Sequence, residues 1–465
     1  MKKFFASLVL SILLLTSFSL PVIAFNDPSS VANNKFGIHI TSEKDLNNAS
    51  NLINSNGGDW GYVTIVITEA ERDHDRWQSV FDQMRRLHLI PIIRLATKAQ
   101  GDVWVKPQDA EINNWIAFLN SLNWVVQNRY VIIGNEPNHA SEWGGAISPG
   151  EYATYLKNFS QKLKAASPDF YVLPAGLDAS AKNITGTMDE AKFINGMLKT
   201  EPTVLDNIDG WTSHSYPNPA FSGKETDTGR GTINTFDWEL SYLKTLGVTK
   251  TLPVFITETG WSNQNLKEDE IGKKLIYAYT NVWNDARVVA VTPFILNYPQ
   301  APFGIFSWQR SDGSFYSFYS DVAKLPKTKG EPTQIVSGQI LGALAQPVIP
   351  IGSDYIGAIL AKNTGQSIWN SKDILIGSDF INTPVKSITF QDIEPTQLGL
   401  IIFKAAAPEN TGIYTRSLFL TDKNNKRVTN SFPIEAYLVK IDQAKIQDFF
   451  SGLLQHLNLG SLFGK

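Results

Sequence analysis

The sequence contains no cysteine, so it can form no disulfide bond and offers no thiolate ligand to a metal ion. Histidine is also scarce, at 6 residues in 465, which argues against a histidine-rich metal cluster. No metal-binding motif appears, and we expect neither a metal ion nor a cofactor. Acidic and basic residues nearly balance, with a formal net charge of -3 and no basic run beyond the extreme N-terminus. This pattern gives no indication of a nucleic-acid partner.

Long apolar runs are confined to the N-terminus. Lys2 and Lys3 precede an uncharged apolar stretch, residues 4–20, and a short exit ending at Ala24. This form is typical of a secretory signal, so we expect residues 1–24 to be removed and the protein to be secreted or extracytoplasmic. An uncleaved N-terminal anchor is the alternative. No later stretch reaches the roughly 18 apolar residues that a membrane span requires, so we expect no transmembrane segment after signal removal.

The 300 residues that follow alternate between short β-branched runs and amphipathic segments. We expect strands at 35–40, 62–67, 89–95, 130–136, 170–175, 208–216, 252–258 and 288–296. We expect helices at 42–56, 73–87, 108–126, 148–166, 188–198, 233–246 and 268–284. Such alternation predicts an α/β fold with a parallel sheet, and eight units favour a (β/α)8 TIM barrel over residues 33–323.

The last third of the chain has a different pattern. Prolines interrupt residues 324–350, which we interpret as a linker, although 335–345 could hold a helix. Short alternating runs over 351–440 predict a smaller all-β sandwich. Its segments Asn363-Thr364-Gly365 to Trp369 and Gly412-Ile413-Tyr414 resemble bacterial immunoglobulin-like accessory modules.

Residues 441–465 are expected to form a C-terminal amphipathic helix. Its apolar stripe consists of Ile446, Phe449, Phe450, Leu453, Leu454 and Leu457. Packing on the protein's own surface or on a partner is one interpretation, and a membrane-surface helix, giving cell-surface or envelope association, is the other. The basic face that membrane-surface helices need is missing.

Two of the expected strands end in a carboxylate. The run Leu252-Pro253-Val254-Phe255-Ile256-Thr257 leads directly to Glu258, and Tyr130-Val131-Ile132-Ile133-Gly134-Asn135 leads to Glu136. Because parallel strands present their C-terminal ends at one edge of a sheet, both acids are expected in one site. Hydrolysis of a glycosidic bond requires such a pair, one acid as proton donor and the other as nucleophile or base.

These motifs, with His214-Ser215-Tyr216-Pro217 between them, resemble the glycoside hydrolases of clan A over about residues 35–320. The resemblance implies a retaining enzyme on a (β/α)8 barrel. It implies that Glu136 is the general acid/base, Glu258 the nucleophile and Asn135 the partner of the sugar 2-hydroxyl. It also implies that His214 and Tyr216 lie beside the nucleophile.

Other candidate pocket residues follow from their positions near strand ends. Arg94 is expected near the site, although an ion pair with Glu69 or Asp178 is an equal alternative. His39 ends the first expected strand, where a core histidine is the common alternative. Trp261 and Trp308 are candidates for stacking against a sugar. The loop residues His139, Glu142 and Trp143 are weaker cleft candidates, and so are Asn297 and Tyr298.

The sequence therefore predicts an exported O-glycosyl hydrolase that cleaves β-linked glycosidic bonds of a poly- or oligosaccharide by double displacement, with a carbohydrate as its partner. The competing hypothesis is a non-catalytic carbohydrate-binding or cell-surface protein that retains the barrel. The two carboxyl groups should lie about 5 Å apart if the first hypothesis holds.

Overall fold

The computed structural model describes residues 27–378, 385–441 and 447–448. The expected signal, 1–24, and nearly all of the expected C-terminal helix, 441–465, lie outside these residues. The chain divides into two compact units. Unit 1 comprises residues 27–74, 87–121 and 128–332, and unit 2 comprises 75–86, 122–127 and the residues from 333 onward. Among the described residues, no helix is both long and apolar enough to cross a membrane.

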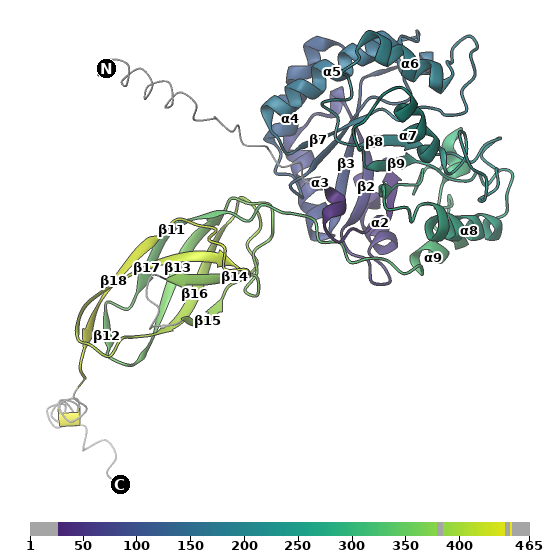
Figure 1. Ribbon diagram of the computed structural model, residues 1–465. Coiled ribbons are helices and arrows are strands. Elements are labelled where there is room, and N and C mark those ends of the chain that lie inside the picture. The colour runs from purple at the N-terminus through teal and green to yellow at the C-terminus, as the bar shows by residue number, and fades with distance from the viewer. Residues whose placement is uncertain (1–26, 379–384, 442–446, 449–465) are drawn as a thin grey trace, which may run out of the picture. The chain divides into compact units, whose positions relative to one another are not determined.

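Parallel strands form the centre of unit 1 (Figure 1). They are β1 (Gly37–Ile40), β2 (Gly61–Thr68), β3 (Leu89–Ala96), β6 (Arg129–Ile133), β7 (Phe170–Pro174), β8 (Trp211–His214), β9 (Val254–Glu258) and β10 (Val288–Val291). Five of them form one sheet in the order β1-β2-β3-β6-β7, and three form another in the order β10-β9-β8. Isolated parallel bridges, Phe36 to Val291 and Asp178 to His214, join the sheets on both sides.

Helices alternate with these strands along the chain, as predicted. They are α2 (Leu46–Ile53), α3 (His74–Arg86), α4 (Ile112–Ser121), α5 (Pro149–Ala166), α6 (Glu190–Thr200), α7 (Thr235–Thr245), α8 (Glu268–Tyr277) and α9 (Ser317–Ala323). A short hairpin, β4 (Ala99–Gln100) with β5 (Val103–Trp104), follows β3. The start of α5 shows why a helix begins there: the Ser148 side chain accepts a hydrogen bond from the Glu151 N–H, and Pro149 occupies the first helical position.

The strands of unit 1 are buried along nearly their whole length, which agrees with their continuous apolar runs. The predicted α/β alternation with parallel strands is confirmed. Two strands are shorter than predicted: the one expected over 208–216 spans only Trp211–His214, and the one expected over 288–296 stops at Val291. Residues 292–296 are therefore not part of a strand, which matters for the site.

Unit 2 contains two four-stranded sheets. Their strands are β11 (Gly338–Ala345), β12 (Val348–Pro350), β13 (Asp354–Asn363), β14 (Ile374–Ser378), β15 (Val385–Thr389), β16 (Leu398–Ala406), β17 (Gly412–Asp422) and β18 (Phe432–Val439). The sheet orders are β11-β13-β16-β15 and β12-β18-β17-β14, and only β12 with β18 is a parallel pair among the printed strand pairs of these sheets. Trp369, Tyr355 and Phe403 belong to their shared apolar core.

The interpretation of 324–350 as a linker is wrong for its second half, and so is the alternative that 335–345 could hold a helix. Residues 338–345 and 348–350 are the strands β11 and β12. Both lie at the edge of their sheets, where glycine and proline are tolerated because one side of the strand has no partner in the ladder. Pro347, just before β12, and Pro350, its last residue, therefore gave a linker-like pattern to a segment that is extended.

Candidate active site

Three strand ends bring the predicted catalytic residues together. His214 is the last residue of β8 and Glu258 the last of β9, and the two are paired in the sheet. Glu136 follows β6 after Gly134, which has a φ of +92°, and Glu136 itself has a φ of +32°. A positive φ in a residue other than glycine is strained, and such residues cluster at functional sites. The Glu136 N–H donates to the Gly176 carbonyl at 3.0 Å, which holds this strained turn in place.

The two carboxylates meet at His214. The His214 Nδ1 lies 2.7 Å from Glu136 Oε1 and 3.9 Å from Glu258 Oε2. One oxygen of each carboxylate and one ring nitrogen all lie within 4.8 Å of one another. The Tyr216 hydroxyl donates to Glu258 Oε2 at 3.1 Å. Glu136 and His214 are 78 positions apart in the sequence, and Tyr216 and Glu258 are 42 positions apart, yet all four belong to one cluster.

Gly176, which follows β7, makes this arrangement possible. A Cβ atom at position 176 would lie 2.2 Å from the His214 ring, so no larger residue fits beside the imidazole. The sequence analysis did not identify Gly176. A glycine two residues beyond a strand is too common in the sequence to be recognised as a site residue.

Burial and neighbouring charges shift the pKa values of the residues in this cluster in different directions. Burial disfavours ionisation of Glu258, but the positive charges of His214 and Arg94 outweigh burial and lower its pKa. Burial alone would lower the pKa of His214, yet Glu258 and Glu136 raise it to about 9. At neutral pH the site therefore holds an imidazolium between two carboxyl groups, with Glu258 ionised. Burial, followed by the Glu258 charge, raises the pKa of Tyr216, so its hydroxyl remains a donor.

His39 lies close to this cluster, as predicted. It is 1% exposed, and neither ring nitrogen has a hydrogen-bond partner among the described residues. Burial lowers its pKa to about 3, with further lowering by Arg94 and His214, so the ring is neutral. A neutral imidazole carries one donor and one acceptor. His39 can thus donate a hydrogen bond to a ligand or accept one from it.

Arg94, on β3, acts on the site through its charge. It is half-buried and lowers the pKa of Glu258. The alternative ion pairs are wrong: Asp178 pairs with His139 at 2.8 Å, and no ion pair joins Arg94 to Glu69 within the described part of the chain. His139, predicted as a loop residue, therefore has a structural partner. The pKa of His139 is raised chiefly by its hydrogen bond to Asp178.

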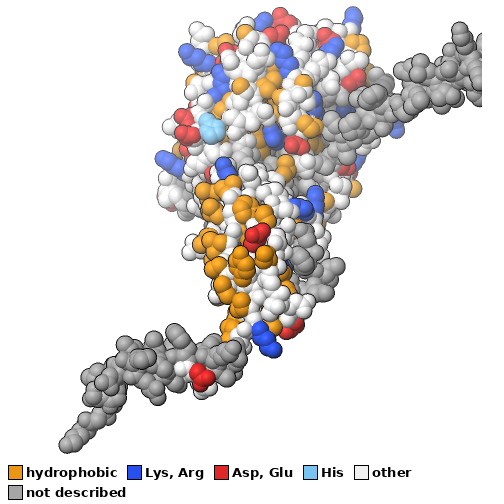
Figure 2. Space-filling model, turned by 90° about the vertical axis from the view of Figure 1, so that its left-hand side faces the viewer, with side chains coloured by type: hydrophobic (Ala, Val, Ile, Leu, Met, Phe, Trp, Pro, Cys, Tyr) orange, Lys and Arg blue, Asp and Glu red, His pale blue; other side chains and the backbone are white. Residues whose placement is uncertain are grey.

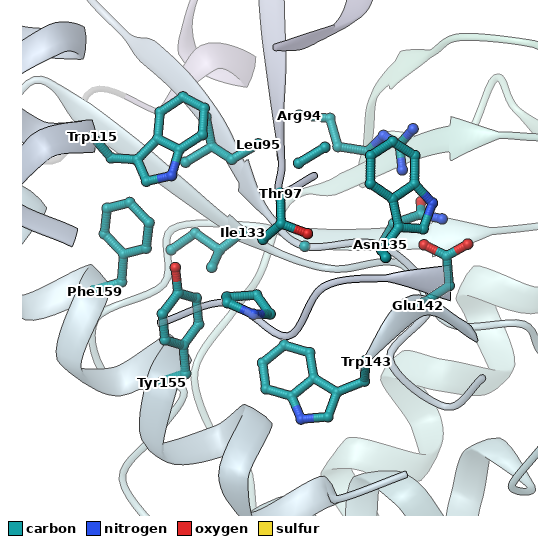
Figure 3. A pocket seen from close by; sticks show the side chains of 14 residues that line it. Arg94, Leu95, Thr97, Trp115, Ile133, Asn135, Glu142, Trp143, Tyr155 and Phe159 are labelled. Carbon is teal, nitrogen blue, oxygen red and sulfur yellow. The ribbon is translucent and has the colours of Figure 1, made fainter. Parts of the chain in front are cut away.

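A pocket lies beside Asn135 and Arg94 (Figure 3). Trp104, Trp143 and Glu142 also line it. Glu142 comes from a short 3-10 turn, Ala140–Glu142, and its carboxyl is within hydrogen-bonding reach of the Asn135 side chain. Burial, partly offset by the Arg94 charge, raises the pKa of Glu142 to about 7. Glu142 is thus a third carboxyl group of the site.

The structure places the two tryptophans that were predicted to stack against a sugar among buried side chains. Trp261 is 4% exposed, and its Nε1 donates to the Gly223 carbonyl at 2.9 Å. Trp308 is 3% exposed and packs edge-on against Phe318. Protein atoms cover both rings, so neither presents a free face to a sugar. A tryptophan near a strand end in sequence is as easily a core residue, because large aromatic side chains dominate cores.

Phe294 is a half-buried aromatic residue that the sequence analysis missed. It lies three residues beyond the end of β10, and its ring packs edge-on against His39 with a centroid distance of 5.2 Å. It also contacts Phe306, which in turn contacts Tyr216. These contacts connect Phe294 to the carboxylate cluster through His39 and Tyr216. The expected strand over 288–296 concealed it, since it placed Phe294 within a strand instead of after one.

Asn297 and Tyr298 lie further along the same segment. The Asn297 amide donates to Asp45 Oδ1 at 3.4 Å, and the Tyr298 ring packs edge-on against Phe303. Neither of these contacts reaches the carboxylates. Both residues were weak candidates, and the structure gives them structural partners.

Glu136, His214 and Glu258 together offer three ligand atoms of the kinds that bind metal ions. A metal-bound histidine must be neutral, and metal binding has to displace its proton. With a pKa of about 9, His214 holds that proton at neutral pH. The cluster is therefore better suited to acid–base chemistry than to holding a cation.

A second pair of acids lies on the other face of β8. Strand side chains alternate, so Trp211 and Ser213 point away from the face that carries His214. Glu190 at the start of α6 and Glu239 in α7 are 0% exposed, and the side chains of Ser213 and Trp211 lie within reach of Glu239. The two carboxyls lie within hydrogen-bonding reach of each other. Burial, and for Glu190 also the neighbouring acid, raises the pKa of both, so the pair holds at least one proton.

Comparisons with known proteins give distant likenesses only. No model of a known protein family matches the chain, and no curated protein matches it. One similar solved structure is a family 39 glycoside hydrolase from Bacteroides cellulosilyticus, 15% identical, covering 82% of each chain with a TM-score of 0.43. Another is a β-mannanase from Thermomonospora fusca, 16% identical, covering 63% of this chain and 91% of that one with a TM-score of 0.40. At these identities and TM-scores the likeness assigns no family to the chain.

Proposed function

We propose that the protein is a retaining glycoside hydrolase that cleaves β-linked glycosidic bonds of a poly- or oligosaccharide. The observation that carries this proposal is the carboxylate pair: oxygens of Glu136 and Glu258 lie within 4.8 Å of each other. Retaining enzymes hold their carboxyls about 5–5.5 Å apart, whereas inverting enzymes leave about 6.5–9.5 Å for a water molecule. The short separation favours direct attack by one carboxylate on the sugar.

The two acids take different roles because their surroundings differ. Glu258 is ionised, and its negative charge is stabilised by His214, Arg94 and the Tyr216 hydroxyl. It therefore suits the nucleophile, which attacks the anomeric carbon and forms a glycosyl ester. The acid role falls to Glu136, whose carboxyl lies 2.7 Å from His214 Nδ1 on the other side of the pair, and which gives a proton to the departing glycosidic oxygen.

Water then completes the reaction. Glu136, now ionised, removes a proton from a water molecule whose oxygen attacks the anomeric carbon and displaces Glu258. The sugar leaves with its original anomeric configuration, and both carboxyls return to their starting states. We assign to the Asn135 amide, next to Glu136 in sequence, a hydrogen bond to the sugar 2-hydroxyl that strengthens as positive charge develops on the ring.

We further propose that the eight parallel strands of unit 1 form one closed (β/α)8 barrel. The bridges Phe36 to Val291 and Asp178 to His214, which join the two sheets on both sides, support this. We propose that unit 2 is an immunoglobulin-like accessory domain and that residues 1–24 direct export, so that the enzyme acts on extracytoplasmic carbohydrate. Detection of the mature protein outside the cytoplasm, beginning after Ala24, would test the last point.

The experiment is a screen of purified protein against β-glucan, mannan, galactan and xylan, with Glu136→Gln and Glu258→Gln as test variants. Glu331→Gln, an exposed acid of unit 1, is the matched control. We expect turnover by the parent and the control, and a loss of at least 10²–10⁴-fold in the test variants. Proton NMR of the first product should show retained configuration. Sugar binding without turnover by the parent on every substrate would instead support a non-catalytic binding protein.

A further inference from the structure

One sheet of unit 2 exposes an unusual number of apolar side chains on its outer surface. Strands β13 and β16 alternate strictly between buried and exposed positions, as expected for a sheet covered on one side. The exposed positions should be polar, yet five of them, and two more on the neighbouring β11, are large aliphatic residues, each 38–67% exposed. We call them the outer apolar face: Leu341, Leu344, Ile356, Leu360, Leu398, Leu400 and Ile402.

These residues form one continuous surface. Leu360 lies opposite Leu400, and Ala358 lies opposite both Ile402 and Leu344. Charged side chains occur at the border of the face, where Lys404 pairs with Asp354 at 3.0 Å. Monomeric proteins rarely expose contiguous apolar patches above a few hundred Å², and larger ones mark interaction sites. Figure 2 shows hydrophobic side chains gathered along this unit.

The chain itself carries a segment that needs such a surface. Residues 446–457 place six large apolar side chains at helical spacing on one stripe, and the described residues Gln447 and Asp448 are helical. A helix of about 12 residues is marginal in isolation, and Gly452 inside it costs about 1 kcal/mol more. The segment can hold a helix only by burying its stripe against another surface.

The dimensions of the segment and of the face agree. Twelve helical residues span about 18 Å, and the stretch of β13 from Ile356 to Lys362 spans about 20 Å. Strand β18 ends at Val439, which lies opposite Pro350. Pro350 is only four residues before Asp354, the first residue of β13. The residues from Val439 to Ile446 can reach about 23 Å when extended, which exceeds the roughly 10 Å between packed sheets.

We propose that residues 446–457 form a helix that packs its apolar stripe on the outer apolar face of the same molecule. A short tether gives the segment an effective concentration in the millimolar range, far above that of a second protein molecule. A membrane is a poorer occupant, because Asp442 and Asp448 offset Lys445 and no basic face results.

The absence of native cysteine allows a direct test in the full-length chain. Leu400→Cys combined with Leu453→Cys places one thiol on the face and one on the stripe. The control combines Leu400→Cys with Gln455→Cys, which lies on the opposite side of the expected helix. After mild oxidation we expect an intramolecular disulfide, read as a mass loss of two hydrogens in a monomer, at least tenfold more in the first pair. Equal yields in the two pairs, or disulfides between molecules only, would overturn the proposal.

A second measurement does not depend on introduced cysteines. Deletion of residues 442–465 should expose the face and increase the fluorescence of an apolar dye several-fold, and Leu400→Ser in the deleted chain should reduce it again. Vesicles of phosphatidylcholine with and without phosphatidylglycerol test the alternative that the apolar stripe binds a membrane. Binding of the full-length protein to either vesicle, together with unchanged dye fluorescence after deletion, would assign the stripe to a membrane instead.

Discussion

The buried acid pair behind β8 makes the stability of the protein depend on pH in a defined direction. Burial raises the pKa of Glu190 and Glu239, and the nearby Ser213, Trp211 and Arg230 only partly offset it, so the folded protein retains a proton there that the unfolded chain loses above about pH 4.5. A group with a raised pKa in the folded state stabilises the fold fully below its unfolded pKa. That stabilisation is lost as the pH rises toward the folded pKa.

Glu239→Gln weakens this dependence. The amide resembles the protonated acid in shape and can donate to Glu190, and the charge of Glu239 no longer raises the pKa of Glu190, so less proton retention accompanies folding. Each retained proton lowers the free energy of unfolding by about 1.4 kcal/mol per pH unit. Above about pH 4.5 we therefore expect the free energy of unfolding of the parent to fall relative to that of the variant, by at most about 1.4 kcal/mol per pH unit, and the variant to be the more stable protein at pH 7.

The assay is thermal unfolding followed by tryptophan fluorescence at several pH values, with Glu331→Gln as the exposed control. A change of 1 kcal/mol corresponds to about 2–4 °C in a domain of this size, so the expected difference in slope is several degrees. Parallel curves for the parent and Glu239→Gln, or a less stable Glu239→Gln at pH 7, would refute the reasoning. The control should follow the parent.

Three further predictions concern the site. Tyr216→Phe removes a donor worth about 1.5–3 kcal/mol to Glu258, so kcat/KM should fall about 10–100-fold and its acidic limb should move to higher pH; an unmoved limb would contradict this. His214 loses its proton as the pH rises through about 9, so the activity of the parent should decline there, and His214→Gln should lack that limb in a pH–rate profile. Glu142→Gln keeps a partner for Asn135 but removes a titration near pH 7, so its pH–rate profile should be flatter between pH 6 and 8.

The strand ends could be predicted because they depend on local pattern. An apolar β-branched run that stops at a carboxylate marks the end of a buried strand, and this holds for Glu258 without knowledge of any neighbour. The parallel arrangement predicted that Glu136 and Glu258 lie at one end of the sheet, and the resemblance to clan A glycoside hydrolases added His214 and Tyr216 beside the nucleophile. The sequence also indicated that His39 and Arg94 lie near the site, since each lies within two residues of the C-terminal end of a buried strand.

The rest depended on packing between distant segments. No local pattern distinguishes Trp308, which is covered by Phe318, from a tryptophan open to solvent. Glu190 and Glu239 resemble ordinary surface helix residues in sequence, and only the fold shows that both are buried against β8. Phe294 was hidden by an overlong strand.

The separation and roles of Glu136 and Glu258 are the centre of this account, and trapping the covalent intermediate tests them most directly. A 2-fluoro glycoside with an activated leaving group, matched to the best substrate class of the screen, should inactivate the enzyme with one sugar attached per molecule. Peptide mass spectrometry should place that sugar on Glu258, and Glu258→Gln should remain unlabelled. A sugar attached to any other residue, or equal labelling of Glu258→Gln, would contradict the account.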